Sequence, residues 1–159
     1  MINTIETMLQ NSFRDRHGEH VRQDIIDLGI AKAPKVKYSQ LYRVEGDLDG
    51  DEVRAIAAKL LTDPVTDTFV IHEADGGNCP QNCKAHRHQI EVWLKHGVTD
   101  TVADSVIKAV RDLGITKDIK VKTGHKYVFE GAITPAAVRQ IAERLLANPM
   151  VQEYRIDGR

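Results

Sequence analysis

The sequence has few of the features that secreted and membrane proteins depend on. Two cysteines among 159 residues cannot build a disulfide framework, which favours a reducing compartment. The N-terminal segment MINTIETMLQ contains neither a basic start nor an apolar run, and no segment approaches the roughly 20 apolar residues of a membrane span. These absences predict a soluble, cytoplasmic protein with no membrane partner.

An excess of positive charge is also missing. The 22 basic residues are scattered among 23 acidic ones, and the net charge is −1. Proteins that bind nucleic acids need a basic face for the phosphate backbone, so we expect no nucleic-acid partner. The chain also lacks a phosphate loop ending in Gly-Lys-Ser/Thr, a Gly-x-Gly-x-x-Gly turn and a Gly-x-Ser-x-Gly elbow. We therefore expect no catalytic residues and no cofactor.

An internal repeat is the main feature that the sequence does contain. The tetrapeptide DLGI occurs at residues 27–30 and again at 112–115. When the chain is aligned with itself at an offset of 85, residues 27–72 match 112–157 without a gap, and 19 of 46 pairs are identical. Self-similarity of this kind marks a repeat architecture. We predict a first repeat at residues 1–72, a linker at 73–88 and a second repeat at 89–159.

The second repeat has the clearer secondary-structure pattern. Residues 89–95 (QIEVWLK) alternate apolar and polar side chains, as a half-buried strand does. Apolar residues then recur at helical spacing from Val102 to Leu113, and Gly114 follows at a position where helices commonly end. Thr134 and Pro135 predict the start of a second helix. Residues 151–157 (VQEYRID) predict a final strand.

Between the two predicted helices, residues 118–131 (DIKVKTGHKYVFEG) predict two short strands around a turn near Gly124. The first repeat shows the same order of elements. Each repeat is therefore expected to form a β-α-β-β-α-β unit, the ferredoxin-like pattern, which gives an α+β fold. A unit of this size leaves one face of its antiparallel sheet uncovered, so we expect the two units to pack as a pseudo-dimer.

A cluster of potential metal ligands lies in the linker. Cys79, Cys83, His86 and His88 are residue types that suit tetrahedral zinc. Their spacing is compressed, matches no common zinc module and leaves little room for supporting hydrogen bonds around an ion. We predict that the cluster binds no stoichiometric metal. A structural zinc site, a metal sensor and a redox-active cysteine pair are the alternative interpretations.

The predicted turn in the second repeat is the candidate binding site. Gly124, His125, Lys126 and Tyr127 would present polar groups at the tip of a hairpin, and loops carry function more often than the elements that they connect. The alternative is a structural turn in which Gly124 adopts a positive φ angle. The sequence alone favours neither interpretation.

Four segments of the second repeat carry recognisable motifs. They are residues 90–100 (IEVWLKHGVTD), 106–115 (VIKAVRDLGI), 119–131 (IKVKTGHKYVFEG) and 144–156 (RLLANPMVQEYRI). These segments resemble PurS, the family of small subunits of phosphoribosylformylglycinamidine synthase. They match the family's first strand and turn, its first helix, its Gly-Lys-containing hairpin and its Leu-Leu-x-Asn-Pro helix end.

The first repeat carries related motifs at residues 13–21 (FRDRHGEHV), 24–30 (DIIDLGI), 40–48 (QLYRVEGDL) and 60–71 (LLTDPVTDTFVI). It resembles the PurS-like segment at the N-terminus of large synthase subunits. Both repeats depart from the family pattern. Ser12 and Phe13 replace the family's Gly-Val, and Ala103 stands where the family and Gly18 of the first repeat have glycine.

The resemblance implies a non-catalytic role. PurS proteins join a PurL-type synthetase and a PurQ-type glutaminase in an ATP- and glutamine-dependent ligase complex of de novo purine biosynthesis. By resemblance, this chain would bridge those two subunits and have no active site of its own, and Gly124 to Tyr127 would contact a partner. The two repeats would supply the family's dimer within one chain, either as a monomeric pseudo-dimer or within a homo-oligomer.

A different class of function fits the same predicted fold. Regulatory ACT-type domains also place β-α-β-β-α-β units in tandem, and fold does not determine function. Such a protein would bind a small effector between its two units. The segment at residues 95–101 (KHGVTDT), which would lie near that effector, offers no evident amino-acid pocket.

Overall fold

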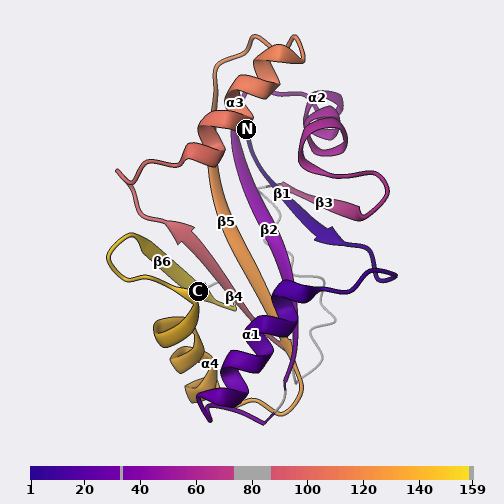
Figure 1. Cartoon of the computed structure of the whole chain (residues 1–159). Helices are drawn as coiled ribbons and strands as arrows, with labels where there is room; N and C mark the ends of the chain where they lie inside the picture. Colours follow the sequence, from indigo (N-terminus) through magenta and orange to yellow (C-terminus); the bar gives the residue numbers. More distant parts are fainter. Residues whose placement is uncertain (33, 74–86, 158–159) are drawn as a thin grey trace. The chain divides into compact units, whose positions relative to one another are not determined.

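The computed structural model describes residues 1–32, 34–73 and 87–157 (Figure 1). The first repeat forms β1 (Ile2–Leu9), α1 (Arg16–Asp27), β2 (Lys35–Gly46), α2 (Gly50–Ile56), the π-helical segment η1 (Ala57–Leu61) and β3 (Asp67–Glu73). The second repeat forms β4 (Arg87–Leu94), α3 (Thr101–Asp112), β5 (Ile119–Glu130), α4 (Pro135–Ile141), the π-helical segment η2 (Ala142–Leu146) and β6 (Gln152–Ile156). The two repeats thus have the same order of elements.

The positions of the helices confirm the internal duplication. Helices α1 and α3 begin at Arg16 and Thr101, which are 85 residues apart, as predicted from the self-alignment. Helices α2 and α4 begin at Gly50 and Pro135, again 85 residues apart. Each of these two helices continues into a five-residue π-helical segment at its C-terminal end. The duplication therefore extends to an uncommon local geometry.

The predicted helix ends of the second repeat are also confirmed. Helix α3 ends at Asp112, and Gly114 has a φ angle of 90°, a conformation that glycine adopts without steric cost. At the start of α4, the Thr134 side chain accepts a hydrogen bond from the Ala137 N–H, and Pro135 occupies the first turn.

The predicted hairpin in each repeat is wrong. Residues 119–130 form the single strand β5, and the equivalent residues of the first repeat form the single strand β2. Gly124 is not among the glycines with a positive φ angle, so it sits in ordinary strand backbone and makes no turn. Beyond it, the buried Tyr127 and Phe129 alternate with the half-buried Val128 and Glu130, as side chains do along a strand.

The chain forms two compact units, and each unit contains segments of both repeats. Among the described residues, unit 1 comprises 1–13, 39–73 and 99–124, and unit 2 comprises 14–32, 34–38, 87–98 and 125–157. The strand order is β3-β1-β2-β5 in unit 1 and β2-β5-β4-β6 in unit 2, because β2 and β5 contribute residues to both units. Strand β1 pairs antiparallel with β2 and β3, and β4 pairs antiparallel with β6. The predicted α+β class is confirmed.

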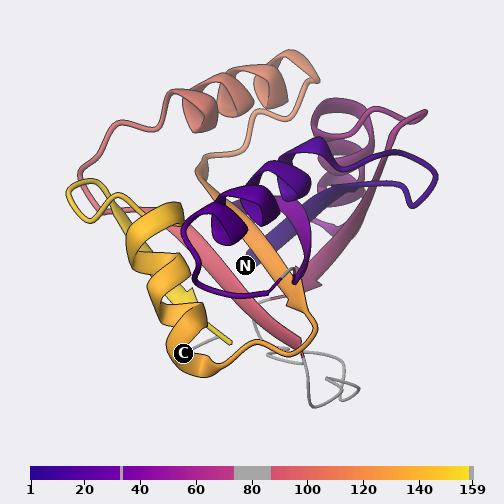
Figure 2. The same cartoon turned by 60° about the horizontal axis from the view of Figure 1, so that its bottom comes forward.

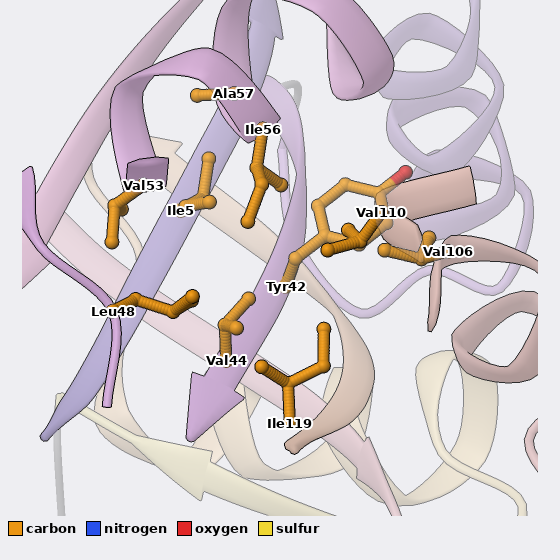
Figure 3. Packing of buried hydrophobic residues seen from close by; sticks show 10 residues of the cluster. All are labelled: Ile5, Tyr42, Val44, Leu48, Val53, Ile56, Ala57, Val106, Val110 and Ile119. Atoms are coloured by element: carbon orange, nitrogen blue, oxygen red, sulfur yellow. The ribbon is translucent and has the colours of Figure 1, made fainter. Parts of the chain in front are cut away.

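Unit 1 has a core built from both repeats. Ile5 of β1 and Ile56 of α2 are fully buried, and Val110 of α3, from the second repeat, is fully buried in the same cluster. The cluster comprises Ile5, Tyr42, Val44, Leu48, Val53, Ile56, Ala57, Val106, Val110 and Ile119 (Figure 3). The middle of the predicted apolar stripe on α3 is therefore buried, whereas Val102 and Leu113 at its ends are exposed.

Unit 2 has the reciprocal composition. Ile25 of α1, from the first repeat, is fully buried beside Phe129 of β5 and Ile141 of α4. The whole cluster comprises Val21, Ile25, Val36, Ile90, Val92, Tyr127, Phe129, Val138, Ile141 and Ala142. Helices α1 and α4, indigo and gold in Figures 1 and 2, cover the same face of strands β4 and β5. One face of the unit is thereby closed by two helices from different repeats.

The repeats thus exchange a helix and half of a strand. Helix α1 and the start of β2 belong to unit 2, whereas α3 and the start of β5 belong to unit 1. Burial of one large apolar side chain stabilises a fold by roughly 1.5–3 kcal/mol. Because Ile25 and Val110 are buried among residues of the other repeat, this stabilisation depends on both repeats being present. The predicted boundaries at 72 and 89 describe repeats of sequence, and the compact units are a different division of the chain.

Among the residues that the structure describes, no helix is both long and apolar enough to span a bilayer.

Candidate functional site

The predicted binding segment lies inside β5 and not at a hairpin tip. Gly124 and Tyr127 are buried, and His125 and Lys126 are half-buried. The expectation that His125 and Lys126 are exposed at a turn is therefore wrong. The chain continues as one strand because its two halves pair within different compact units, so no hairpin closes at this point.

His125 and Tyr127 belong to a cluster of four rings in unit 2. The other two rings are His17, on the first turn of α1, and Tyr38 of β2. The ring centroids of His17 and Tyr38 are 4.0 Å apart in a stacked arrangement, and Tyr38 lies 5.4 Å from Tyr127 and 5.8 Å from His125. These separations are in the range of favourable aromatic contacts.

Two hydrogen bonds connect the rings in pairs. Tyr38 Oη lies 2.7 Å from His125 Nδ1, and His17 Nε2 lies 3.3 Å from Tyr127 Oη. Burial raises the pKa of Tyr127 above its ordinary value, so its hydroxyl stays neutral at physiological pH. The cluster therefore offers hydrogen-bonding groups and ring faces on the helix-covered side of the unit 2 strands.

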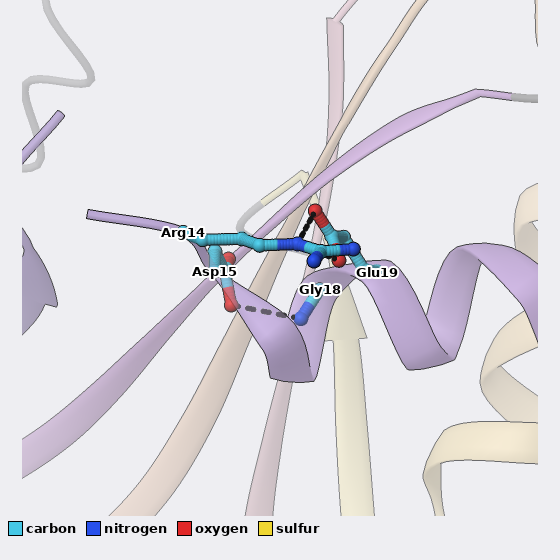
Figure 4. Close-up of polar contacts among 4 residues, drawn as sticks. All are labelled: Arg14, Asp15, Gly18 and Glu19. Carbon is cyan, nitrogen blue, oxygen red and sulfur yellow. Dashed lines mark hydrogen bonds and ion pairs between the residues drawn. The ribbon is translucent and has the colours of Figure 1, made fainter. Parts of the chain in front are cut away.

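Asp15 fixes the position of two of the four rings. Its Oδ1 accepts a hydrogen bond from the Gly18 N–H at 2.8 Å and so caps α1, as Figure 4 shows. Its Oδ2 accepts a hydrogen bond from the Tyr38 N–H, also at 2.8 Å. One carboxylate thus holds the start of α1, with His17, against the strand that carries Tyr38.

Gly18 permits a close approach of α1 to β2. A Cβ atom at this position would lie 2.5 Å from the Val36 carbonyl oxygen and 2.6 Å from Asp15 Oδ2. Both separations are far below van der Waals contact, so a side chain here would push α1 away from the strand. The glycine of the first repeat is therefore required by packing.

The neighbouring ion pair is a surface feature. Arg14 Nε donates to Glu19 at 2.7 Å, and both side chains are exposed (Figure 4). The hydrogen bond from Arg14 lowers the pKa of Glu19 from its ordinary value. Exposed pairs of this kind contribute little to stability, so the position of α1 depends on Asp15 and on the core.

The proposed absence of metal in the linker stays a prediction. Cys79, Cys83 and His86 lie outside the described residues, and His88 is described at the start of β4. Its Nδ1 lies 3.0 Å from Asp157 Oδ2, and Asp157 Oδ1 accepts a hydrogen bond from the Gln89 N–H. Within the described part of the chain, no three His, Cys, Asp or Glu side chains are arranged to hold a metal ion.

The sequence did not identify His17 and Tyr38 as candidate site residues. In the 85-residue register they align with Val102 and Thr123, and His125 aligns with Gln40. These three mismatches lie at one place in unit 2, yet they are far apart along the chain. The three mismatched positions could have indicated the site from the sequence. Recognising that they lie together requires the knowledge that α1 packs on strands of the second repeat.

Comparison with known proteins assigns the chain to a family. The family model for PurS, described as phosphoribosylformylglycinamidine (FGAM) synthase, matches residues 87–159. The phosphoribosylformylglycinamidine synthase subunit PurS of Archaeoglobus fulgidus is 38% identical over 72 residues, which cover 42% of this chain and 90% of that protein. A match across nearly the whole length of a relative is more than a shared motif. The chain belongs to the PurS family.

Proposed function

We propose that the chain is a PurS-type subunit of phosphoribosylformylglycinamidine synthase and acts in purine biosynthesis. The observation that carries this proposal is the match to the Archaeoglobus fulgidus PurS subunit over 90% of its length. The family model supports it independently through residues 87–159. The internal duplication adds a second repeat of the same pattern, so one chain provides two PurS-like repeats.

The chain's role in the complex is to join the other subunits. Its partners are a PurL-type synthetase and a PurQ-type glutaminase, and it bridges them without performing chemistry itself. The difference between its two compact units supports a bridge, because a bridge needs two unlike surfaces. At the surface, unit 2 exposes His17 at the start of α1, whereas unit 1 exposes Val102 at the equivalent position of α3.

Within the predicted binding segment, Lys126 is our candidate for the contact with a partner. Gly124 and Tyr127 are buried, and His125 is turned to the helix-covered side by its bond to Tyr38. Lys126 follows His125 in the strand, so its side chain projects from the opposite face of the sheet. A cation on that face can attract an acidic surface of a partner and speed association.

Co-purification with charge-reversed variants tests the proposal. The tagged chain, expressed in its native host, should recover the PurL-type and PurQ-type subunits, identified by mass spectrometry. The Lys126→Glu variant should recover less of at least one of them. Lys120→Glu is the matched control, because Lys120 lies on the same face of β5 and is exposed.

The two variants must have the same thermal midpoint as the wild-type chain, so that a difference in recovery reflects binding. Recovery of neither subunit by the wild-type chain would contradict the bridging role. Equal recovery by Lys126→Glu and Lys120→Glu would leave the bridging role intact and remove Lys126 from the contact.

A further inference from the structure

The four-ring cluster of unit 2 joins one repeat to the other. His17 and Tyr38 belong to the first repeat, and His125 and Tyr127 belong to the second. Both hydrogen bonds of the cluster cross between repeats, namely Tyr38 Oη to His125 Nδ1 at 2.7 Å and His17 Nε2 to Tyr127 Oη at 3.3 Å. Three of the four ring contacts also cross between repeats.

The equivalent positions of unit 1 hold different residues. Val102 replaces His17, Thr123 replaces Tyr38, Gln40 replaces His125, and only Tyr42 repeats Tyr127. Valine has no hydrogen-bonding group, and neither valine nor threonine has a ring to stack. The two places where the repeats meet therefore differ in chemistry, although the surrounding helices and strands are duplicated.

This difference matters because the repeats could also pair with copies of themselves. Two first repeats would place Gln40 opposite Tyr38, which removes the ring contact that His125 makes. Two second repeats would place Val102 and Thr123 opposite Tyr127 and His125, which removes the stacking and both tyrosine–histidine hydrogen bonds. The hydroxyl of Tyr127, in a residue that is only 6% exposed, would then lose its His17 partner.

We propose that the His17–Tyr38–His125–Tyr127 cluster determines which repeats pair. The surface formed by α1 and the start of β2 fits a PurS-like repeat with histidine at position 125, and it disfavours a second copy of the first repeat, which has Gln40 at that position and shares the tyrosine. The cluster thus acts as a specificity contact between unlike repeats. This inference does not rest on the proposed role as a PurS-type subunit, because pairing is measured without any other protein.

A full-length chain that is cut after folding can test the proposal. A protease recognition sequence is inserted among residues 74–86, and the folded protein is cleaved there, unfolded in denaturant and refolded. The two pieces differ in mass, so native mass spectrometry resolves the mixed pair from the two same-repeat pairs. Random pairing would give as much same-repeat complex as mixed complex.

The wild-type pieces should reassemble almost entirely as the mixed pair. Replacement of the cluster with the residues of unit 1, by His17→Val, Tyr38→Thr and His125→Gln, should lower the ratio of mixed to same-repeat pairs about fivefold, as expected for the loss of a hydrogen bond and a ring contact. Tyr38→Phe is the conservative variant. It keeps the ring, removes the bond to His125 and should give a smaller decrease in the same direction.

Tyr154→Phe is the matched control. It also removes a tyrosine hydrogen bond, from Tyr154 Oη to Glu143 Oε1 at 2.7 Å, but both partners belong to the second repeat. Its ratio of mixed to same-repeat pairs should equal that of the wild type. The proposal is overturned if the wild-type pieces pair at random or fail to reassemble as the mixed pair, or if Tyr38→Phe retains the same ratio as Tyr154→Phe.

Discussion

Asp15 and Asp100 hold equivalent positions in the two repeats and make equivalent pairs of hydrogen bonds. One oxygen of each carboxylate caps a helix, by accepting from the Gly18 N–H at 2.8 Å or the Ala103 N–H at 2.9 Å. The other oxygen of Asp15 accepts from the Tyr38 N–H at 2.8 Å. The other oxygen of Asp100 accepts from the Thr123 N–H in the same way. Each aspartate therefore joins its helix to the long strand of its own repeat.

Removal of these carboxylates should destabilise the fold unequally. Asp100 accepts a third hydrogen bond, from Thr123 Oγ1 at 2.9 Å, in addition to that from the Thr123 N–H. Loss of a helix cap costs about 1 kcal/mol, and an orphaned strand N–H costs about 1–3 kcal/mol. Asp100→Ala should lower the free energy of unfolding in urea by about 3 kcal/mol, and Asp15→Ala by somewhat less.

Asparagine at these positions is the discriminating control. Its single side-chain oxygen can serve the cap or the strand but not both, so Asp100→Asn should lose about half as much stability as Asp100→Ala. Equal stability of Asp100→Asn and the wild type would contradict the double role of the carboxylate.

The glycine at position 18 should be intolerant of a methyl group. Gly18→Ala places a Cβ atom 2.5 Å from the Val36 carbonyl oxygen, and overpacking of this kind costs about 1–3 kcal/mol. The second repeat has Ala103 at the equivalent position, which is buried. Ala103→Gly should cost no more than about 1 kcal/mol. Urea unfolding of both variants measures whether Gly18→Ala costs more stability than Ala103→Gly. A Gly18→Ala variant as stable as the wild type would refute the prediction.

Acid should weaken unit 2 through Glu130. A hydrogen bond from Arg87 is the main cause that holds the pKa of Glu130 below its ordinary value of 4.5. A carboxylate with a lowered pKa in the folded state stabilises above its unfolded pKa, and this stabilisation is lost as pH falls through the folded pKa. At pH 7, Glu130→Gln should be less stable than the wild type by about 0.5 kcal/mol, since the pair is partly exposed.

The difference in stability between the wild type and Glu130→Gln should shrink as the pH falls below 4.5. Thermal unfolding at a series of pH values measures it. In an Arg87→Gln background the effect of Glu130→Gln should become smaller, because Arg87 is the main group that lowers the pKa of Glu130, and Lys37 and Lys35 contribute less. A stability difference of undiminished size in that background would assign the effect to a group other than Arg87.

The linker should contain no stoichiometric metal. Cys79, Cys83, His86 and His88 have a spacing that matches no common zinc module. Elemental analysis of protein purified without chelator checks this prediction. One zinc per chain would contradict it, and a Cys79→Ser variant would then show whether the linker is the binding site.

The helices and the duplication were predictable from sequence because their signals are local or periodic. Thr134 and Pro135 indicate a helix start, and Gly114 indicates a helix end, whatever the rest of the chain does. The 85-residue register located the equivalent elements of the first repeat in the same way.

The exchange between the repeats could not be predicted in this way. A Gly-containing stretch such as residues 123–125 is compatible with a turn or with a continuous strand, and the choice depends on which strands pair with each half. Contacts distant in sequence make that choice, for example the approach of Gly46 to Ile119, where a Cβ atom would lie 2.9 Å from Ile119 Cγ2. The ring cluster was missed for the same reason, because His17 meets Tyr127 across 110 residues.

The central claim, that this chain serves as the PurS-type subunit, is tested most directly by the glutamine-dependent turnover of a reconstituted synthase. The cognate PurL-type and PurQ-type subunits are assayed for amidine formation with glutamine or with ammonia, in the presence and absence of this chain. We predict that the chain alone shows no turnover, that its addition restores the glutamine-dependent rate, and that the ammonia-dependent rate changes little. An unchanged glutamine-dependent rate when the chain is omitted would contradict the account.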